Sequence, residues 1–185
     1  MLQNKRRFGL IGYPLDHSFS PTYFEKKFRR ENIEDAEYLL FPLSDITQIR
    51  HFVKQNPTLQ GFNITHPYKK EILPFLDDID DEAARISAVN CVLVQRIGTK
   101  NLLKGYNTDI EGIELTLNML NLEPNSKALI FGSGGASKAV GYILRHRGIE
   151  YFTVSRSAKN GDITYDNLTS DIIAERHLLV NTTPL

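Results

Sequence analysis

The sequence contains one cysteine, Cys91, and this scarcity excludes two classes of protein. A lone thiol can form neither an internal disulfide framework nor a cysteine cluster for a metal ion. No apolar run approaches the length of a membrane span, and residues 1–7 lack the apolar core of a signal peptide. We therefore expect a cytoplasmic protein with no membrane partner and no metal.

An excess of charge of one sign is also missing. Lys and Arg total 22, and Asp and Glu total 22, so no net field would attract nucleic acid. The chain of 185 residues is 41% hydrophobic and 24% charged, which is ordinary for a globular protein of one or two domains. We expect its partners to be small molecules.

Short apolar segments alternate with segments of helical periodicity along most of the chain. Expected strands cover 7–12, 36–41, 59–64, 88–95, 101–106, 149–154 and 177–181. Expected helices begin at Ser20, as the N-cap before Pro21, and cover 44–55, 80–87 and the segment after Asn107. Gly98 favours an antiparallel hairpin between the fourth and fifth of these strands.

This alternation predicts an α/β fold with two domains. Residues 1–106 would form a mixed open α/β sheet that binds substrate, and residues 107–185 would form a Rossmann-type domain. Three apolar stripes predict the buried helix faces: Phe24 and Phe28; Ile46, Ile49 and Val53; Ile110, Ile113, Leu117 and Leu120. The acidic run 77–82 is interpreted as a solvated helix start.

Residues 128–140 read as a strand, a glycine turn and a helix. Gly132 permits the tight turn, and Gly134 lets the backbone approach a pyrophosphate. The helix after Ala136 would direct its N–H groups at that anion. Ser137 replaces the third glycine of the G-x-G-x-x-G pattern, so an ordinary glycine turn before a helix is the alternative.

The strand 149–154 ends at Ser155-Arg-Ser157. NAD-binding domains usually place an acidic residue there to bind the ribose hydroxyls, and this sequence has none. Arg156 instead stands where a 2′-phosphate would need a cation. The pattern therefore favours NADP as cofactor.

Three polar stretches follow strands or begin helices, at 18–21, 61–70 and 105–109. In an open α/β sheet such loops line the binding crevice. Together they would offer hydroxyls, amides, an amine and a carboxylate, a set suited to a small polyhydroxylated acid. Each stretch alone is also explained by capping and turn chemistry, and His17 shows no distinct signal.

Six ordered motifs together resemble the shikimate dehydrogenase family over the whole chain. They are Gly12-Tyr-Pro-Leu-Asp-His-Ser-Phe-Ser-Pro21, Gly61-Phe-Asn-Ile-Thr-His-Pro-Tyr-Lys69, Ala88-Val-Asn90, Gly105-Tyr-Asn-Thr-Asp109, Gly132-Ser-Gly-Gly-Ala136 and Val180-Asn-Thr-Thr-Pro-Leu185. The resemblance implies NADPH-dependent, reversible reduction of 3-dehydroshikimate to shikimate in aromatic amino-acid biosynthesis, by a monomer or a homodimer.

The resemblance also implies a role for individual residues. Ser18 and Ser20 would hold the substrate carboxylate, and Lys69 and Asp109 would act at the reacting oxygen. The ring hydroxyls would be surrounded by Thr65, Lys69, Asn90 and Asp109. NADP would be bound by Gly132, Ser133, Gly134, Gly135, Ala136, Ser137, Ser155, Arg156, Ser157 and Lys159, with Asp81 near the nicotinamide.

Three features depart from the family pattern. Ser155-Arg-Ser157 replaces the commoner Asn-Arg-Thr, and Cys91 stands where threonine is frequent. Family members continue past the Asn-Thr-Thr-Pro-Leu motif, so we expect a truncated chain with an incomplete cofactor domain. The alternatives are a quinate/shikimate dehydrogenase of broader specificity and a non-catalytic shikimate-binding domain. Retention of both Lys69 and Asp109 argues against a mere binder.

Overall fold

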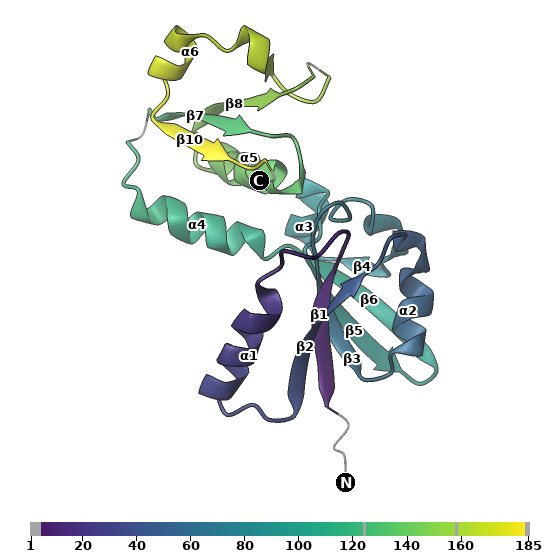
Figure 1. Ribbon diagram of the computed structural model, residues 1–185. Helices are drawn as coiled ribbons and strands as arrows, with labels where there is room; N and C mark the ends of the chain where they lie inside the picture. Colours follow the sequence, from purple (N-terminus) through teal and green to yellow (C-terminus); the bar gives the residue numbers. More distant parts are fainter. Residues whose placement is uncertain (1–4, 124, 158, 184–185) are drawn as a thin grey trace. The chain divides into compact units, whose positions relative to one another are not determined.

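The computed structural model describes residues 5–123, 125–157 and 159–183 (Figure 1). Contacts divide the chain into two compact units, Met1–Asn107 and Thr108–Leu185, which we call unit 1 and unit 2. Each unit is built around its own sheet, with six strands in the described part of unit 1 and four in that of unit 2. The predicted α/β fold with two sheets is confirmed.

Unit 1 contains a mixed sheet, as the sequence predicts. Its strands are β1 (Arg6–Gly12), β2 (Ala36–Pro42), β3 (Leu59–Ile64), β4 (Asp78–Ile79), β5 (Cys91–Ile97) and β6 (Lys100–Tyr106). Their order is β2-β1-β3-β5-β6-β4, with β5 antiparallel to both of its neighbours and the other pairs parallel. The predicted hairpin is confirmed, because β5 pairs with β6 across a turn in which Gly98 has a φ of +58°.

Helices cover both faces of this sheet (Figure 1). They are α1 (Ser20–Arg30), the 3-10 turns Ile46–Gln48 and Leu73–Phe75, α2 (Ile49–Gln55) and α3 (Asp81–Ile86). Phe24 and Phe28 of α1 pack on the cluster that contains Leu10 and Tyr38. The stripe Ile46, Ile49 and Val53 lies in a separate, larger core cluster. Both predicted apolar stripes of unit 1 are therefore confirmed.

Two helix starts differ from the prediction. Phe19, not Ser20, is the N-cap of α1, and its side chain makes no capping bond; Ser20 is the first helical residue. The expected helix 44–55 begins as the 3-10 turn Ile46–Gln48, and Asp45 caps it by accepting a hydrogen bond from the Thr47 N–H at 2.9 Å. The helical pattern is thus correct, while the local capping chemistry moves the ends.

The acidic run 77–82 is only partly the solvated helix start that we expected. Asp77 accepts hydrogen bonds from Arg50 and from the Leu103 N–H, each at 2.7 Å, which lowers the pKa of its carboxyl group. Asp78 is paired with Lys104 at 2.7 Å, and this contact also lowers its carboxyl pKa. Asp77 and Asp78 thus link the start of the edge strand β4 to β6 and to α2. Only the residues from Asp80 onward belong to the helix start.

Unit 2 contains an all-parallel sheet of Rossmann type, as predicted. Its elements are α4 (Asp109–Met119), β7 (Lys127–Phe131), α5 (Gly135–His146), β8 (Glu150–Ser155), β9 (Ile163–Thr164), a 3-10 turn (Tyr165–Asn167), α6 (Ser170–Ala174) and β10 (Leu178–Asn181). The strand order is β10-β7-β8-β9, and each pair is parallel. The buried core combines Ile143 and Leu144 of α5 with Leu129 and Ile130 of β7.

Helix α4 packs on α5, and Arg147 donates to the Glu114 carbonyl and to Asn118 of α4 at 3.2 and 2.7 Å. Ile110 and Leu117 are buried as expected. Leu120 is not part of the buried stripe, because it follows the last helical residue and is 48% exposed. No helix in the described part of the chain is long and apolar enough to cross a bilayer.

Candidate substrate and cofactor sites

The loops that follow β1 and β3 lie side by side in unit 1. The Thr65 N–H donates to the Ile11 carbonyl at 3.0 Å, and the Tyr13 N–H donates to the His66 carbonyl at 3.2 Å. A Cβ atom on Gly12 would collide with the Thr65 side chain, so glycine is required for this close approach. The predicted substrate residue Thr65 is therefore fixed at the carboxyl end of the sheet.

Ser18 and Ser20 stand at the start of α1, and both are half-buried. The Ser18 hydroxyl accepts a hydrogen bond from the Ser20 N–H at 3.3 Å, so Ser18 takes part in the turn that begins the helix. Ser20 is the first helical residue of α1. Capping chemistry accounts for Ser18, and binding of a carboxylate by the two serines stays a prediction.

Asn90 lies where three strands meet. Its carbonyl accepts from the Ile64 N–H at 2.9 Å, and its N–H donates to the Tyr106 carbonyl at 3.0 Å. The predicted strand began at Ala88, but β5 begins at Cys91. These bonds explain the difference, because the buried segment 88–90 bridges β3 and β6 instead of pairing as a regular strand. Asn90 is thereby held beside the end of β3.

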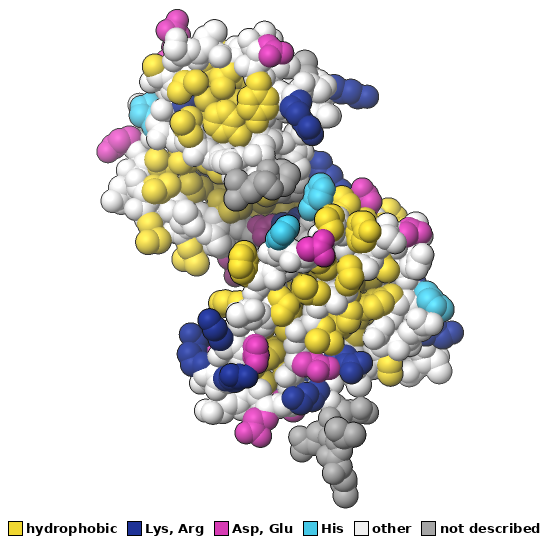
Figure 2. Space-filling view, viewed as in Figure 1, with side chains coloured by type: hydrophobic (Ala, Val, Ile, Leu, Met, Phe, Trp, Pro, Cys, Tyr) yellow, Lys and Arg dark blue, Asp and Glu magenta, His cyan; other side chains and the backbone are white. Residues whose placement is uncertain are grey.

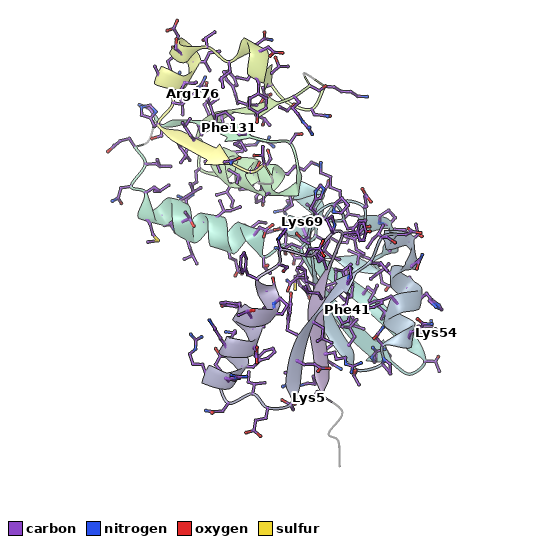
Figure 3. All side chains as sticks on the ribbon, viewed as in Figure 1. Lys5, Phe41, Lys54, Lys69, Phe131 and Arg176 are labelled. Atoms are coloured by element: carbon purple, nitrogen blue, oxygen red, sulfur yellow. The ribbon has the colours of Figure 1, made fainter. Side chains whose placement is uncertain are left out.

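Lys69 lies in the turn after β3, and the Val89 N–H donates to its carbonyl at 2.8 Å. Figure 3 shows this lysine at the end of the sheet where β1 and β3 finish. The side chain is half-buried. Unit 1 therefore brings together the predicted substrate residues Thr65, Lys69 and Asn90 at the end of its sheet where β1 and β3 finish, and Ser18 and Ser20 follow β1 at the start of α1.

Two further predicted residues belong to other elements. Asp109 is the first residue of α4 and belongs to unit 2, so its partnership with Lys69 stays a prediction. Asp81 is exposed in the first turn of α3, in unit 1, and its proximity to a nicotinamide also stays a prediction.

Sequence reasoning did not single out Tyr38 and Asn63. The Tyr38 hydroxyl donates to the Asn63 side-chain oxygen at 2.8 Å, and the Asn63 amide donates to the Asn90 carbonyl at 3.3 Å. Burial raises the pKa of the Tyr38 hydroxyl, and burial also raises the pKa of the nearby Cys91 thiol. Asn63 within the apolar strand 59–64 was the available signal, since a polar residue there needs a partner.

The glycine turn of unit 2 has the form that the sequence predicts. Gly132 has a φ of +109° and donates its N–H to the Val154 carbonyl at 2.9 Å, so β7 turns sharply. Gly134 is the N-cap of α5, and a Cβ atom there would meet no described atom within 4 Å. The first turn, with Gly135 and Ala136, contains no acidic residue. An anion could therefore approach the helix start.

The turn after β8 presents Arg156. The buried Ser155 hydroxyl donates to the Ser157 carbonyl at 2.6 Å and accepts from the Ser157 N–H at 3.1 Å. The Ser157 hydroxyl accepts from the Lys159 N–H at 3.3 Å. Arg156 and Lys159 are exposed, and neither forms an ion pair within the part of the chain that the structure describes. Ser155 thus shapes the turn, while the two cations face outward.

Two predictions fall partly outside the described residues. The predicted cofactor segment 155–159 includes Ala158, which is not described. The Val180–Leu185 motif ends in Pro184 and Leu185, which are not described either. Of that motif, Thr182 is described: its N–H and hydroxyl donate to the Phe131 carbonyl at 2.8 and 2.7 Å. This pairing places the end of β10 beside the glycine turn.

Comparison with known proteins then identifies the family. Residues 10–92 match the model of the shikimate dehydrogenase substrate binding domain. The chain is 35% identical to the shikimate dehydrogenase (NADP(+)) of Clostridium botulinum, over 96% of this chain and 70% of that protein. The corresponding enzyme of Methanosphaera stadtmanae is 30% identical, over 96% of this chain and 67% of that protein. The chain belongs to the shikimate dehydrogenase family.

Solved structures agree with this assignment. Shikimate dehydrogenase from Aquifex aeolicus superposes with a TM-score of 0.83 at 32% identity, over 99% of this chain and 70% of that one. The enzyme from Thermus thermophilus, solved in complex with shikimate, superposes with a TM-score of 0.80 at 30% identity, over 96% of this chain and 68% of that one. The predicted resemblance and fold are confirmed.

The chain is shorter than its relatives. It spans 70% of the Clostridium botulinum enzyme and 67% of the Methanosphaera stadtmanae enzyme. It spans 49% of the shikimate dehydrogenase of Staphylococcus haemolyticus, to which it is 39% identical. The segment that matches the family model includes Ser18, Ser20, Thr65, Lys69 and Asn90. These are the residues predicted to contact substrate in unit 1.

Two surface grooves are lined by none of the predicted substrate residues of unit 1, Ser18, Ser20, Thr65, Lys69 and Asn90. One of about 750 Å³ in unit 2 is lined by Lys159 but by none of the residues of the glycine turn. Another of about 540 Å³ lies between α1 and β2 at the start of that strand. Among the described residues, no cluster of three or more His, Cys, Asp or Glu could hold a metal ion.

Proposed function

We propose that the protein is an NADP-dependent shikimate dehydrogenase that reversibly reduces 3-dehydroshikimate to shikimate in aromatic amino-acid biosynthesis. The observation that supports this most is the grouping of Thr65, Lys69 and Asn90 at one end of the unit 1 sheet, with Ser18 and Ser20 at the start of the helix that follows β1. Hydroxyl, amide and ammonium groups together suit a ring that bears hydroxyls and a carboxylate.

The proposed roles follow from the chemistry of each side chain. Ser18 and Ser20 bind the carboxylate, and Thr65 and Asn90 bind ring hydroxyls. Lys69 donates a proton to the ketone oxygen as hydride arrives, and removes it in the reverse direction. Its ammonium charge also stabilises the developing oxyanion. Asp109 orients this amine and accepts a hydrogen bond from the substrate hydroxyl.

The residues of unit 2 fit NADP. The open helix start at Gly134 suits the pyrophosphate, and the exposed Arg156 and Lys159 suit a 2′-phosphate. When bound, the cofactor supplies the hydride. Gly132, Ser133, Gly135 and Ala136 would line its phosphates, Ser155 and Ser157 would hold the turn that bears Arg156, and Asp81 would approach the nicotinamide.

We also propose that the protein works in the cytoplasm as a monomer or a homodimer, with small molecules as its partners. The balanced charge supports this choice of partners, and Figure 2 shows both acidic and basic side chains on the visible face of each unit.

Binding of shikimate tests the substrate side of this proposal. Titration calorimetry should show shikimate binding to the unaltered protein, and the double variant Ser18→Ala/Ser20→Ala should bind it at least about tenfold more weakly, because two donors to a carboxylate are lost. Ser44→Ala, an exposed serine outside the site, is the matched control. Equal affinity of the double variant would remove the carboxylate role of the pair.

A further inference from the structure

Asn107 is a buried polar residue at the last position of unit 1. It follows β6, is 7% exposed, and belongs to the motif Gly105–Asp109, in which only Asp109 has a proposed role. A buried amide group is costly unless it is hydrogen-bonded, so the partner of this side chain indicates what the residue does.

The side-chain amide of Asn107 donates to the Ala88 carbonyl at 2.9 Å, within the protein interior. The bond joins two of the sequence motifs, because Ala88 is the first residue of Ala88-Val-Asn90. The pairing of β5 with β6 ends at Cys91 and Tyr106, so the Ala88 carbonyl lies beyond the strand ladder. The asparagine side chain therefore takes the place of a strand partner.

The segment 88–90, which Asn107 holds, is itself bonded to the predicted site. The Val89 N–H donates to the Lys69 carbonyl at 2.8 Å. Lys69 is proposed to move the proton, and Asn90 is proposed to bind a ring hydroxyl. Asn107 is thus fixed to a segment that both holds the Lys69 backbone and carries Asn90.

Asp109 lies two residues after Asn107 and is the first residue of α4. Unit 1 ends at Asn107, so the chain leaves this unit directly after the anchored residue. Consecutive Cα atoms are about 3.8 Å apart, which keeps the Cα atom of Asp109 within about 8 Å of that of Asn107. The anchor therefore limits where Asp109 can lie.

We propose that Asn107 is a positioning residue that anchors the start of α4 and thereby sets Asp109 for its part in the reaction. This inference rests on the proposed function and adds a residue to it. Asp109 orients the Lys69 amine in that function, and a misplacement of about 1 Å in an active site can lower the rate about 100-fold. Without the bond to Ala88, the backbone at 107–109 gains freedom, and Asp109 is held less precisely.

Asn107→Ala removes the anchoring amide. In the protein with any residues that follow Leu185 included, we expect this variant to lower kcat for shikimate oxidation by about 10- to 100-fold. KM for shikimate should change less, because the segment 88–90 keeps its backbone bonds to its neighbours.

Asn101→Ala is the matched control. Asn101 lies at the other end of β6, and its side chain accepts a hydrogen bond from Arg96 at 2.7 Å. Its replacement also removes one side-chain hydrogen bond from the same strand, but far along the strand from Asn107. The control should keep kcat within about twofold of the unaltered value.

A double-mutant cycle with Asp109→Asn distinguishes positioning from a general loss of stability. If Asn107 acts through Asp109, Asn107→Ala should lower kcat clearly less in the Asp109→Asn background than in the unaltered protein. Equal fold losses in both backgrounds, or an unchanged kcat of Asn107→Ala, would overturn the positioning role and leave the proposed function intact. No shikimate oxidation by the unaltered protein would contradict the proposed function and the role together.

A second measurement uses no variant and so does not depend on the folding of Asn107→Ala. In protein labelled at the asparagine side-chain nitrogen, the NMR signals of the Asn107 amide should shift on saturation with shikimate. The reason is that Asn107 is bonded to the segment that carries Asn90 and is followed by Asp109, and both are proposed to contact the ligand. The Asn101 amide signals should not shift. Unmoved Asn107 signals in the shikimate-saturated protein would contradict the proposal.

Discussion

In the protein with any residues that follow Leu185 included, Lys69→Ala is expected to lower kcat for shikimate oxidation by about 10²- to 10⁴-fold, the range typical of a lost general acid–base group. Hydride transfer to a ketone leaves an oxygen that needs a proton, and a lysine ammonium provides both that proton and a stabilising charge. Lys69 is half-buried, and the bond from Val89 to its carbonyl holds its backbone beside the segment that leads to Asn90. Shikimate affinity should change much less than kcat.

Lys70→Ala provides the control for this experiment. Lys70 is the next residue, has the same charge, and is exposed. Its replacement should leave kcat within about twofold of the unaltered value. If Lys69→Ala kept its kcat and only raised KM, Lys69 would be a binding residue and another group would have to move the proton.

Arg156→Ala is expected to raise KM for NADPH by about 10- to 100-fold, since hydrogen bonds to charged groups contribute more than neutral ones. The effect on NADH should be small, because NADH has no 2′-phosphate. Arg156 is exposed at the turn that follows β8, where the sequence has no acidic residue for the ribose hydroxyls. A planar guanidinium matches a phosphate group with two donors at once.

Steady-state kinetics with both cofactors would measure this preference. Arg145→Ala, another exposed cation of unit 2, lies outside the turn and should leave both KM values nearly unchanged. Equal losses with NADPH and NADH would show that Arg156 does not recognise the 2′-phosphate.

Much of the fold follows from the sequence because its signals are local. Strand 59–64 is an apolar run bounded by polar residues, and the structure gives the same bounds for β3. The glycine turn at Gly132 is equally local, since its φ of +109° is a conformation that favours glycine. The two-residue strands β4 and β9 were not predicted, because two residues are too few for a periodic pattern.

The missing part of the site depends on contacts between distant residues. Tyr38 reads as an ordinary aromatic residue of a strand, and nothing near it in the chain indicates that its hydroxyl donates to Asn63. Only the strand order, which places β1 between β2 and β3, brings these two residues together. Ser20 was predicted as an N-cap from its local sequence, but the helix begins one residue earlier than that pattern indicates, with Phe19 as N-cap.

Transfer of labelled hydride tests the proposed function most directly. The protein, with any residues that follow Leu185 in its reading frame included, would be incubated with 3-dehydroshikimate and NADPH that bears deuterium at the transferable position of its nicotinamide ring, and the product would be analysed by mass spectrometry. The proposed function predicts shikimate that contains deuterium on the carbon of the new hydroxyl, in an amount equal to the NADP⁺ formed. Unchanged 3-dehydroshikimate, or shikimate without the label, would contradict it.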